Sequence, residues 1–246
     1  HGVVDAYEHK DKLKTSSVEG KQTRHLDPEE TPKPLVWMSK RRGIDNSGGG
    51  QAWVTSDRWG PLKDQLLHLS YGQSKMYLVL KEEKNGQVQG GVTRLNVPLS
   101  SSAMRARINK RDGQLYASGL KGWQTNARSN GGLDRIRYTG KPVYMPKSLQ
   151  VKKDLIEIGF HEKLSKTEAS DLAKYKLGAW NLKWSHAYGS PEIPVDGLEI
   201  EKVYLSDDGK TVALHIPNLK PVHMMQIDYE LKFADAHSTK GRTDNT

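Results

Sequence analysis

The sequence predicts an all-β protein built from short antiparallel strands. Short apolar runs recur along most of its 246 residues, and turn signals such as Asn85-Gly86 and Asp207-Asp208-Gly209 separate them. Within residues 76–81, Met76, Leu78 and Leu80 alternate with Tyr77, Val79 and Lys81, as in a strand packed on both faces. Hydrophobic residues make up 35% of the sequence, so a chain of this length can form one large or two modest β domains.

Residues 1–34 carry mixed charges and end in the run DPEETPKP. Pro28, Pro32 and Pro34 block regular structure and favour extended backbone. We therefore expect a linker or wrapping arm here, and we expect the packed layers to begin at Leu35.

Residues 35–145 form a long series of predicted strands. The expected strands span residues 35–38, 51–55, 65–70, 75–82, 88–97, 103–108, 115–120 and 133–138. Two stretches, DGQLYASG at 112–119 and QAWVTSD at 51–57, share a pattern of turn and strand that favours propeller blades. Eight strands make about two blades, and a closed ring needs about four or more. This region therefore predicts partial propeller-like blades whose strand edges need a neighbour.

Residues 146–234 predict a second β unit. Strands are expected near residues 149–151, 155–160, 177–184, 200–205, 211–216 and 225–233, with a short helical or looped segment at 166–175. Six or seven strands in about 90 residues are typical of an immunoglobulin-like β-sandwich. Trp180 and Trp184 would share one face of a strand, which places both in the sandwich core. Residues 235–246 are polar, and we expect a frayed tail there.

Composition restricts the function classes. The net charge of +9 permits attraction to polyanions. The basic residues lack the interleaved aromatic pattern of a nucleic-acid reader, so nucleic acid is not an expected partner. No apolar run approaches the ~20 residues that span a bilayer. The chain has no cysteine, which excludes disulfides, Fe–S clusters and covalent haem c attachment within it.

Several stretches also resemble a known family. WVTSDRWGPLKDQLLHLSYG at 53–72, RDGQLYASGLKGWQTNA at 111–127 and GLDRIRYTGKPVYMP at 132–146 resemble the C-terminal part of exported bacterial six-bladed-propeller proteins. These proteins are related to soluble glucose and sorbosone dehydrogenases and are often associated with a c-type cytochrome. Residues 156–192 and 203–219 resemble the Ig-like domain that follows the propeller in that family.

The resemblance implies an exported protein, periplasmic or extracellular, that oxidises sugars or otherwise acts on carbohydrate. Haem c would lie only on a separate domain or chain. The missing propeller blades, or another protein chain, would be the partner.

Residues 44–72 gather the main candidate site residues. Asp45, Asn46 and Asp57 offer oxygen ligands that suit calcium, although the same residue types form ordinary turns by bonding their own backbone. We place the candidate catalytic role on His68 and Asp57, with His68 as a general base. The alternative for His68 is a structural histidine whose hydrogen bonds are satisfied within the fold.

Two tryptophans are candidates for sugar binding. Trp123, with Gln124 and Arg128, could form a wall beside Trp59, because a flat aromatic ring matches the apolar face of a pyranose. The alternative for Trp123 is a side chain that fills the gap between blades.

His1 suggests a different chemistry. An N-terminal histidine can bind copper through its amine and its ring, as in copper-dependent polysaccharide monooxygenases. Three functions therefore stand from the sequence: a part of a sugar-oxidising or carbohydrate-active propeller protein, a non-catalytic structural or interaction subunit that docks on a partner chain, and a copper monooxygenase that uses His1.

Overall fold

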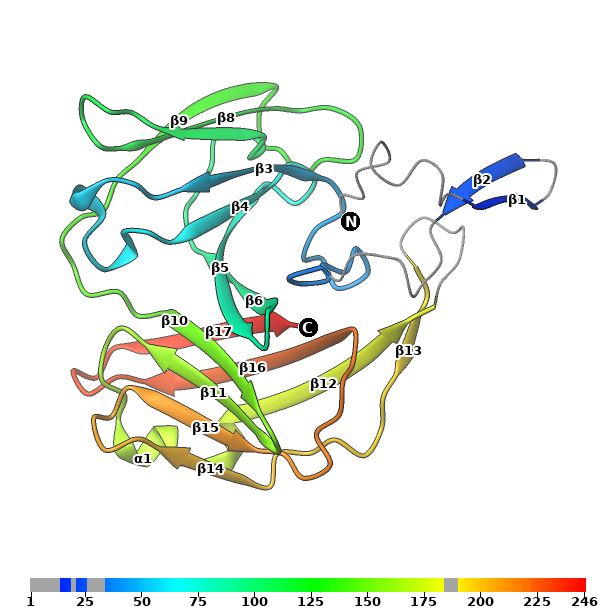
Figure 1. Ribbon diagram of the computed structural model, residues 1–246. Helices are drawn as coiled ribbons and strands as arrows, with labels where there is room; N and C mark the ends of the chain where they lie inside the picture. Colours follow the sequence, from blue (N-terminus) through cyan, green and yellow to red (C-terminus); the bar gives the residue numbers. More distant parts are fainter. Residues whose placement is uncertain (1–13, 19–20, 26–33, 184–189) are drawn as a thin grey trace.

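The computed structural model describes residues 14–18, 21–25, 34–183 and 190–246. It confirms the all-β prediction, because the described strands form antiparallel sheets, none of which is closed. Figure 1 shows two stacked regions joined by strands that run from one to the other. Within the segment expected to be a linker, β1 (Lys14–Val18) and β2 (Lys21–His25) pair as a hairpin.

One eight-stranded sheet organises the molecule. Its order is β13-β12-β16-β17-β6-β5-β4-β3. The members are β3 (Gly48–Trp53), β4 (Leu66–Ser70), β5 (Lys75–Lys84), β6 (Gln87–Leu95), β12 (Tyr175–Leu182), β13 (Glu192–Pro194), β16 (Met224–Lys232) and β17 (Ser238–Asn245). The sheet therefore continues across residue 145, where the sequence suggests a boundary.

Two smaller sheets pack against this large sheet. The first consists of β7 (Arg105–Ile108), β8 (Leu115–Leu120) and β9 (Gly131–Ile136), and β7 contacts β3. The second consists of β10 (Pro146–Lys152), β11 (Leu155–Phe160), β14 (Lys202–Leu205) and β15 (Thr211–His215), and β10 contacts β5 and β6. Figure 1 shows the first sheet at the top and the second at the bottom.

Short helical segments fill the connections. Helix α1 (Lys166–Ala169) and a 3-10 turn (Leu172–Lys174) link β11 to β12, and another 3-10 segment (Asp57–Leu62) links β3 to β4. The helical or looped segment predicted at 166–175 is therefore present, and strand β12 begins at its last residue.

One hydrophobic core runs through both regions. Alternation places Leu67, Leu69 and Leu78 on the inner face of the upper strands, and Ile156 and Phe160 on the inner face of the lower sheet. All five side chains are almost fully buried in the same cluster. Both regions thus share a core as well as a sheet.

A second cluster covers the opposite face of the large sheet. Ile44, Tyr77, Val92 and Trp180 are buried there. Residues 35–38, which the sequence predicts as a strand, pack on this cluster without joining a sheet. The strand prediction for residues 35–38 is wrong. Pro34 and the position of this segment over the second cluster favour side-chain packing over backbone pairing.

The predicted frayed tail is also wrong, because strand β17 occupies most of it. Thr243 pairs with Thr93 of β6 on one side and with Ile227 of β16 on the other. Its neighbours Asp244 and Asn245 are buried as well. The free edge expected for the first β unit is therefore covered, at β6, by a strand from the far end of the sequence.

Candidate ligand-binding site

Asp45 and His68 lie together at the start of the predicted site unit. His68 Nε2 lies 2.7 Å from Asp45 Oδ2. The Ser70 hydroxyl and the Ser47 N–H donate to Asp45 Oδ1, at 2.5 and 2.9 Å. These contacts fasten the segment that covers the sheet to strand β4, next to the point where the Tyr77 hydroxyl donates to the Ile44 carbonyl at 2.6 Å.

The Asp45 carboxylate is held as an anion by these donors. Burial raises the pKa of Asp45, but the hydrogen bonds from His68, Ser70 and Ser47 outweigh burial and hold the pKa below its usual value. Both carboxylate oxygens are therefore occupied by protein groups. This arrangement favours the structural interpretation of His68.

Replacing Asp45 with alanine is expected to lower the free energy of unfolding by about 1–3 kcal/mol, because His68, Ser70 and the Ser47 N–H lose their shared acceptor. Urea unfolding followed by tryptophan fluorescence measures the loss. The Asp57→Ala variant removes an exposed carboxylate and serves as the control, with an expected change within about 0.5 kcal/mol. Equal stabilities of the two variants would contradict the structural role.

The structure separates Asp57 from the other calcium candidates. Asp45 precedes β3 and Asp57 follows it, so a strand of roughly 20 Å lies between them. Asp57 is 87% exposed and forms an ion pair with Lys63. Asn46 bonds instead to the Gln124 carbonyl, which accepts from its amide at 3.1 Å. The structure therefore does not bring Asp57 together with Asp45 and Asn46, its partners in the predicted calcium set, or with His68, the other candidate catalytic residue.

Trp59 is also placed differently from the prediction. Its side chain is only 2% exposed, and its indole N–H donates to the Gly113 carbonyl at 3.1 Å. The ring packs in the main core and offers no open face to a sugar.

Trp123 lies on the loop between β8 and β9 and is 83% exposed. It does not fill a gap between strands, and Gln124 and Arg128 beside it are exposed too. Gln124 takes a left-handed backbone conformation, with φ of 55°. The structure thus keeps Trp123, Gln124 and Arg128 on one loop but removes Trp59 from the predicted wall.

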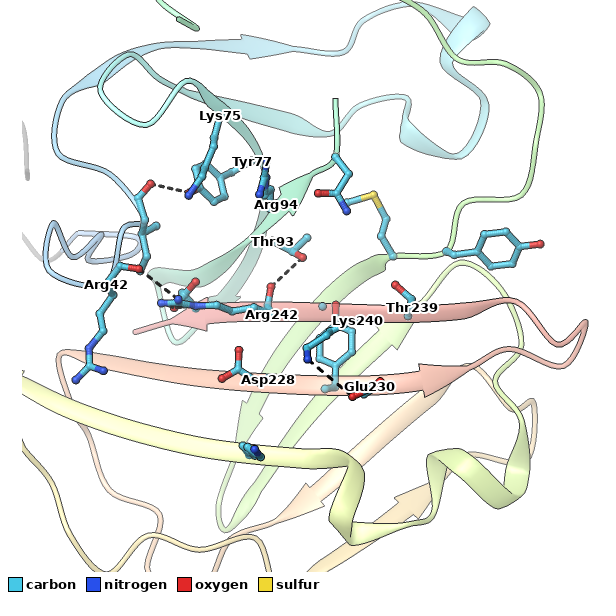
Figure 2. Close-up of a pocket in the computed structure, with 18 of the residues that line it drawn as sticks. Arg42, Lys75, Tyr77, Thr93, Arg94, Asp228, Glu230, Thr239, Lys240 and Arg242 are labelled. Atoms are coloured by element: carbon cyan, nitrogen blue, oxygen red, sulfur yellow. Dashed lines mark hydrogen bonds and ion pairs between the residues drawn. The ribbon is translucent and has the colours of Figure 1, made fainter. Parts of the chain in front are cut away.

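A cleft of about 680 Å³ lies on the face of the large sheet that carries the second cluster. Figure 2 shows it between the ends of β5 and β6 and the length of β16 and β17. Its cationic lining is Arg42, Lys75, Arg94, Lys174, Lys176, Lys240 and Arg242. Three acidic residues oppose them: Asp228, Glu230 and Asp244. The cleft therefore has a net positive charge.

Strand register explains why these residues meet. Asp228 pairs with Arg242 across β16 and β17. The pairing of β17 with β6 ends at Thr243 and Thr93, so Arg242 and Arg94 are the first residues beyond the last pair, and both line the cleft. Like charges that lie close together repel each other. An acid or a ligand at this point would offset the repulsion.

Lys75 adds a third positive charge to this place. Partial burial lowers the pKa of Lys75, and the nearby Arg94 and Arg242 lower it further, while Asp244 opposes the shift. Its ammonium group donates to the Gly43 carbonyl at 2.9 Å. The cationic character of the cleft is thus concentrated where β5, β6 and β17 meet.

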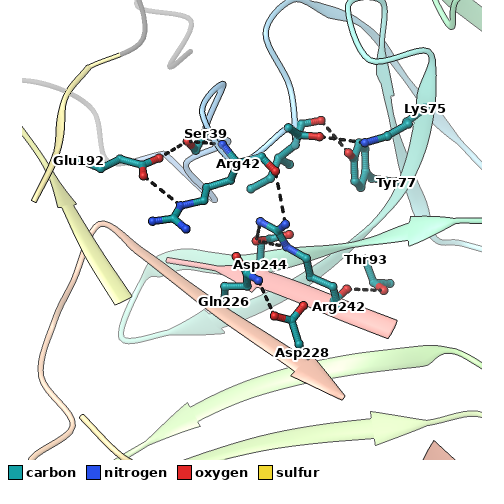
Figure 3. A network of polar contacts seen from close by, with 12 residues as sticks. Ser39, Arg42, Lys75, Tyr77, Thr93, Glu192, Gln226, Asp228, Arg242 and Asp244 are labelled. Carbon is teal, nitrogen blue, oxygen red and sulfur yellow. Dashed lines mark hydrogen bonds and ion pairs between the residues drawn. The ribbon is translucent and has the colours of Figure 1, made fainter. Parts of the chain in front are cut away.

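Asp244 is the internal counter-charge. Arg242 donates to Asp244 Oδ1 through Nε at 2.8 Å and through Nη2 at 2.6 Å, as Figure 3 shows. The carboxyl group is buried, and burial raises the pKa of Asp244 to about 6 despite the Arg242 guanidinium. Asp228 raises it further, and Lys75 lowers it.

This pKa predicts a pH-dependent stability. The folded pKa of about 6 lies above the unfolded value near 3.8, so Asp244 contributes stability that is present below pH ~4 and lost as the pH rises through 6. Relative to the Asp244→Asn variant, the natural protein should lose on the order of 2–3 kcal/mol between pH 4 and pH 7. Urea unfolding of both proteins at several pH values measures this, and parallel pH profiles would contradict it.

No local sequence pattern predicts the cleft. Five of its cations lie on strands, where alternation indicates only which face of that one strand they share. Arg42 and Lys174 lie on connections between strands. The pairing of β17 with β6 brings the cations of the two regions together, and no local sequence pattern predicts this pairing. Alternation around residues 75 and 94 indicates which face of each strand these side chains occupy. It does not indicate which strands lie beside that face.

The structure describes only part of the remaining predicted features. His1 and Trp184 lie outside the described residues, so the copper site and one half of the tryptophan pair have no structural description. Trp180 is buried, and Arg42 stacks over its ring at 3.7 Å from the centroid. Over residues 14–18, 21–25, 34–183 and 190–246, no three metal-binding side chains of the His, Asp and Glu types gather. In the same part of the chain no helix is long and apolar enough to cross a bilayer.

Comparison of the chain with protein-family models, with curated proteins and with solved structures found no match.

Proposed function

We propose that this chain binds a saccharide in the cleft, as part of a larger exported carbohydrate-active or sugar-oxidising protein. The observation that carries the proposal is a cleft of about 680 Å³ with a mainly polar and charged lining. Small-molecule sites commonly have volumes of several hundred Å³. Sugar hydroxyl groups both donate and accept, so a saccharide requires both kinds of partner.

The lining contains both kinds of partner. Arg94 and Lys176 donate, and Asp228 and Glu230 accept. Asn96 can do both. Figure 2 shows that the acids extend from β16 and that Arg94 lies on the β6 side, so a bound ring would contact both.

The family resemblance and the strand order together support the finer fold interpretation. Strands β3 to β6 follow one another as a four-stranded meander, and β7 to β9 form a second meander that contacts β3, as two partial propeller blades would. Strands β10 to β17 supply two facing sheets, as an Ig-like sandwich would. In this proposal the remaining blades lie on further polypeptide, and haem c lies on a separate domain or chain.

Oligosaccharide binding measured by calorimetry tests the proposal. The probes are neutral gluco- and xylo-oligosaccharides and an oligogalacturonate. The double variant Asn96→Ala, Asp228→Ala is expected to weaken binding about tenfold or more, since two polar partners are lost. The Trp123→Ala variant on the exposed loop is the matched control and should bind normally. If no saccharide binds, or if only Trp123→Ala abolishes binding, the cleft proposal is wrong.

A second function, the interaction subunit, has its own support. Leu120 and Leu133 are 44% and 71% exposed on the outer face of the β7–β9 sheet. The inner face of this sheet already packs on the β3 end of the large sheet, so we propose that a further apolar β-sheet of a partner chain packs on the outer face in the same way. Sedimentation velocity of the natural protein and of the Leu133→Lys variant tests this proposal. The proposal is contradicted if the natural protein is a monomer at all concentrations and binds no partner sheet.

A further inference from the structure

Arg94 differs from the other two arginines of the cleft, Arg42 and Arg242, because its side chain has no acidic partner. Arg42 pairs with Glu192, and Arg242 pairs with Asp244. Arg94 is exposed, and within the described part of the chain its side chain makes no hydrogen bond or ion pair. Its guanidinium therefore keeps its full set of donors for a ligand.

The charges around Arg94 are positive. Arg242 and Arg94 both follow the last residue pair of β17 and β6, and both lie close enough to Lys75 to lower its pKa. Asp244, an acid close enough to Lys75 to affect its pKa, already accepts two hydrogen bonds from Arg242 on a single oxygen. Asp228 lies opposite Arg242 on the β16 side. Two carboxylates thus face three cations, which leaves an excess of positive charge at this point.

The acids elsewhere in the cleft have cationic or polar neighbours of their own. Glu230 lies opposite Lys240 across β16 and β17. Asp228 accepts from the Gln226 amide at 2.5 Å and lies opposite Lys176 across β12 and β16. None of these contacts supplies a counter-charge to Arg94.

We infer that the saccharide bound in the cleft is anionic, and that Lys75, Arg94 and Arg242 bind its carboxylate or sulfate group. This inference rests on the proposed saccharide-binding role of the cleft. A planar guanidinium binds a carboxylate or a sulfate through two parallel N–H donors, and a nearby ammonium adds a point charge. An oxyanion here would also offset the repulsion between Arg94 and Arg242. The acids on β16 would then accept hydrogen bonds from the hydroxyl groups of the same sugar.

Three oligosaccharides of equal length test the inference: a neutral galactan, a sulfated galactan and an oligogalacturonate. Inorganic sulfate is the fourth probe. Calorimetry on the full chain should show that both anionic oligosaccharides bind at least about tenfold more tightly than the neutral one at low salt, and that 0.3 M salt reduces this preference. A preference for one anionic probe identifies sulfate or carboxylate as the recognised group.

The variant Arg94→Gln should remove this preference, and Arg137→Gln provides a matched loss of charge on an exposed arginine outside the cleft. The melting temperature of Arg94→Gln should equal or exceed that of the natural protein, because the change relieves repulsion. A lost preference with intact stability therefore reports on the site and not on folding.

The possible results separate the inference from the proposed function. If the neutral galactan binds as tightly as the anionic ones and Arg94→Gln changes nothing, the inference is overturned and the saccharide role stands. If only inorganic sulfate binds, and Arg94→Gln abolishes it, the saccharide role is overturned together with the inference. If no probe binds up to ~10 mM, both are wrong.

Discussion

Replacing Thr243 with proline is expected to lower the free energy of unfolding by roughly 4 kcal/mol or more. Thr243 lies in β17 with a strand on each side, paired with Thr93 and with Ile227. Proline removes an N–H from the ladder and leaves a buried acceptor without its donor, and the ring crowds the adjacent strand. The loss affects both halves of the molecule, because β17 is the strand that joins them.

The matched control is Thr243→Val, which keeps the N–H and nearly the same shape, and which should change stability by less than about 1.5 kcal/mol. Urea unfolding followed by far-UV circular dichroism measures both variants. A proline variant as stable as the valine variant would show that β17 is not a central strand.

The second large effect is expected for Phe160→Ala, which should lower the free energy of unfolding by about 3–5 kcal/mol. Phe160 is 1% exposed at the end of β11. Its ring makes an edge contact with Tyr229, with centroids 5.6 Å apart, and another with Phe233 at 6.0 Å. Alanine removes these contacts and leaves a cavity that a β-sheet cannot easily close.

Phe160→Leu is the control for Phe160→Ala and should lose roughly half as much, because leucine fills part of the cavity. The same experiment tests the continuity of the core. Since one cluster contains Phe160 and the leucines of β4, fluorescence and circular dichroism should report one shared transition in each variant. Two separate transitions would show that the two regions unfold independently.

Most of the strands could be predicted from the sequence because their signal is local. Alternation and turn residues give the strand at 115–120 with the bounds of β8, and they give β5 and β16 within two residues at each end. The all-β class follows from the same patterns. The strand β17 was missed because its residues, STKGRTDN, contain no large apolar side chain. Its neighbours β6 and β16 supply the apolar surface instead.

The site could be predicted only in part, for a related reason. Asp45 and His68 were singled out together, and they do meet, but their role depends on a third partner, Ser70. Trp59 was predicted to line a sugar-binding wall, and its indole instead donates inside the core to a carbonyl of a distant turn. Arg94 and Arg242 carried no signal, because their proximity exists only after the strands have paired.

The join between β6 and β17 has a consequence for how this protein is made. The Thr93 hydroxyl and the Arg242 carbonyl that it bonds lie 149 positions apart. While a ribosome translates the segment between them, one edge of β6 has no partner, and its amide and carbonyl groups remain open to strands of other nascent chains. We expect aggregation during biosynthesis to be greatest in this interval, and chaperone protection to be needed until β17 emerges.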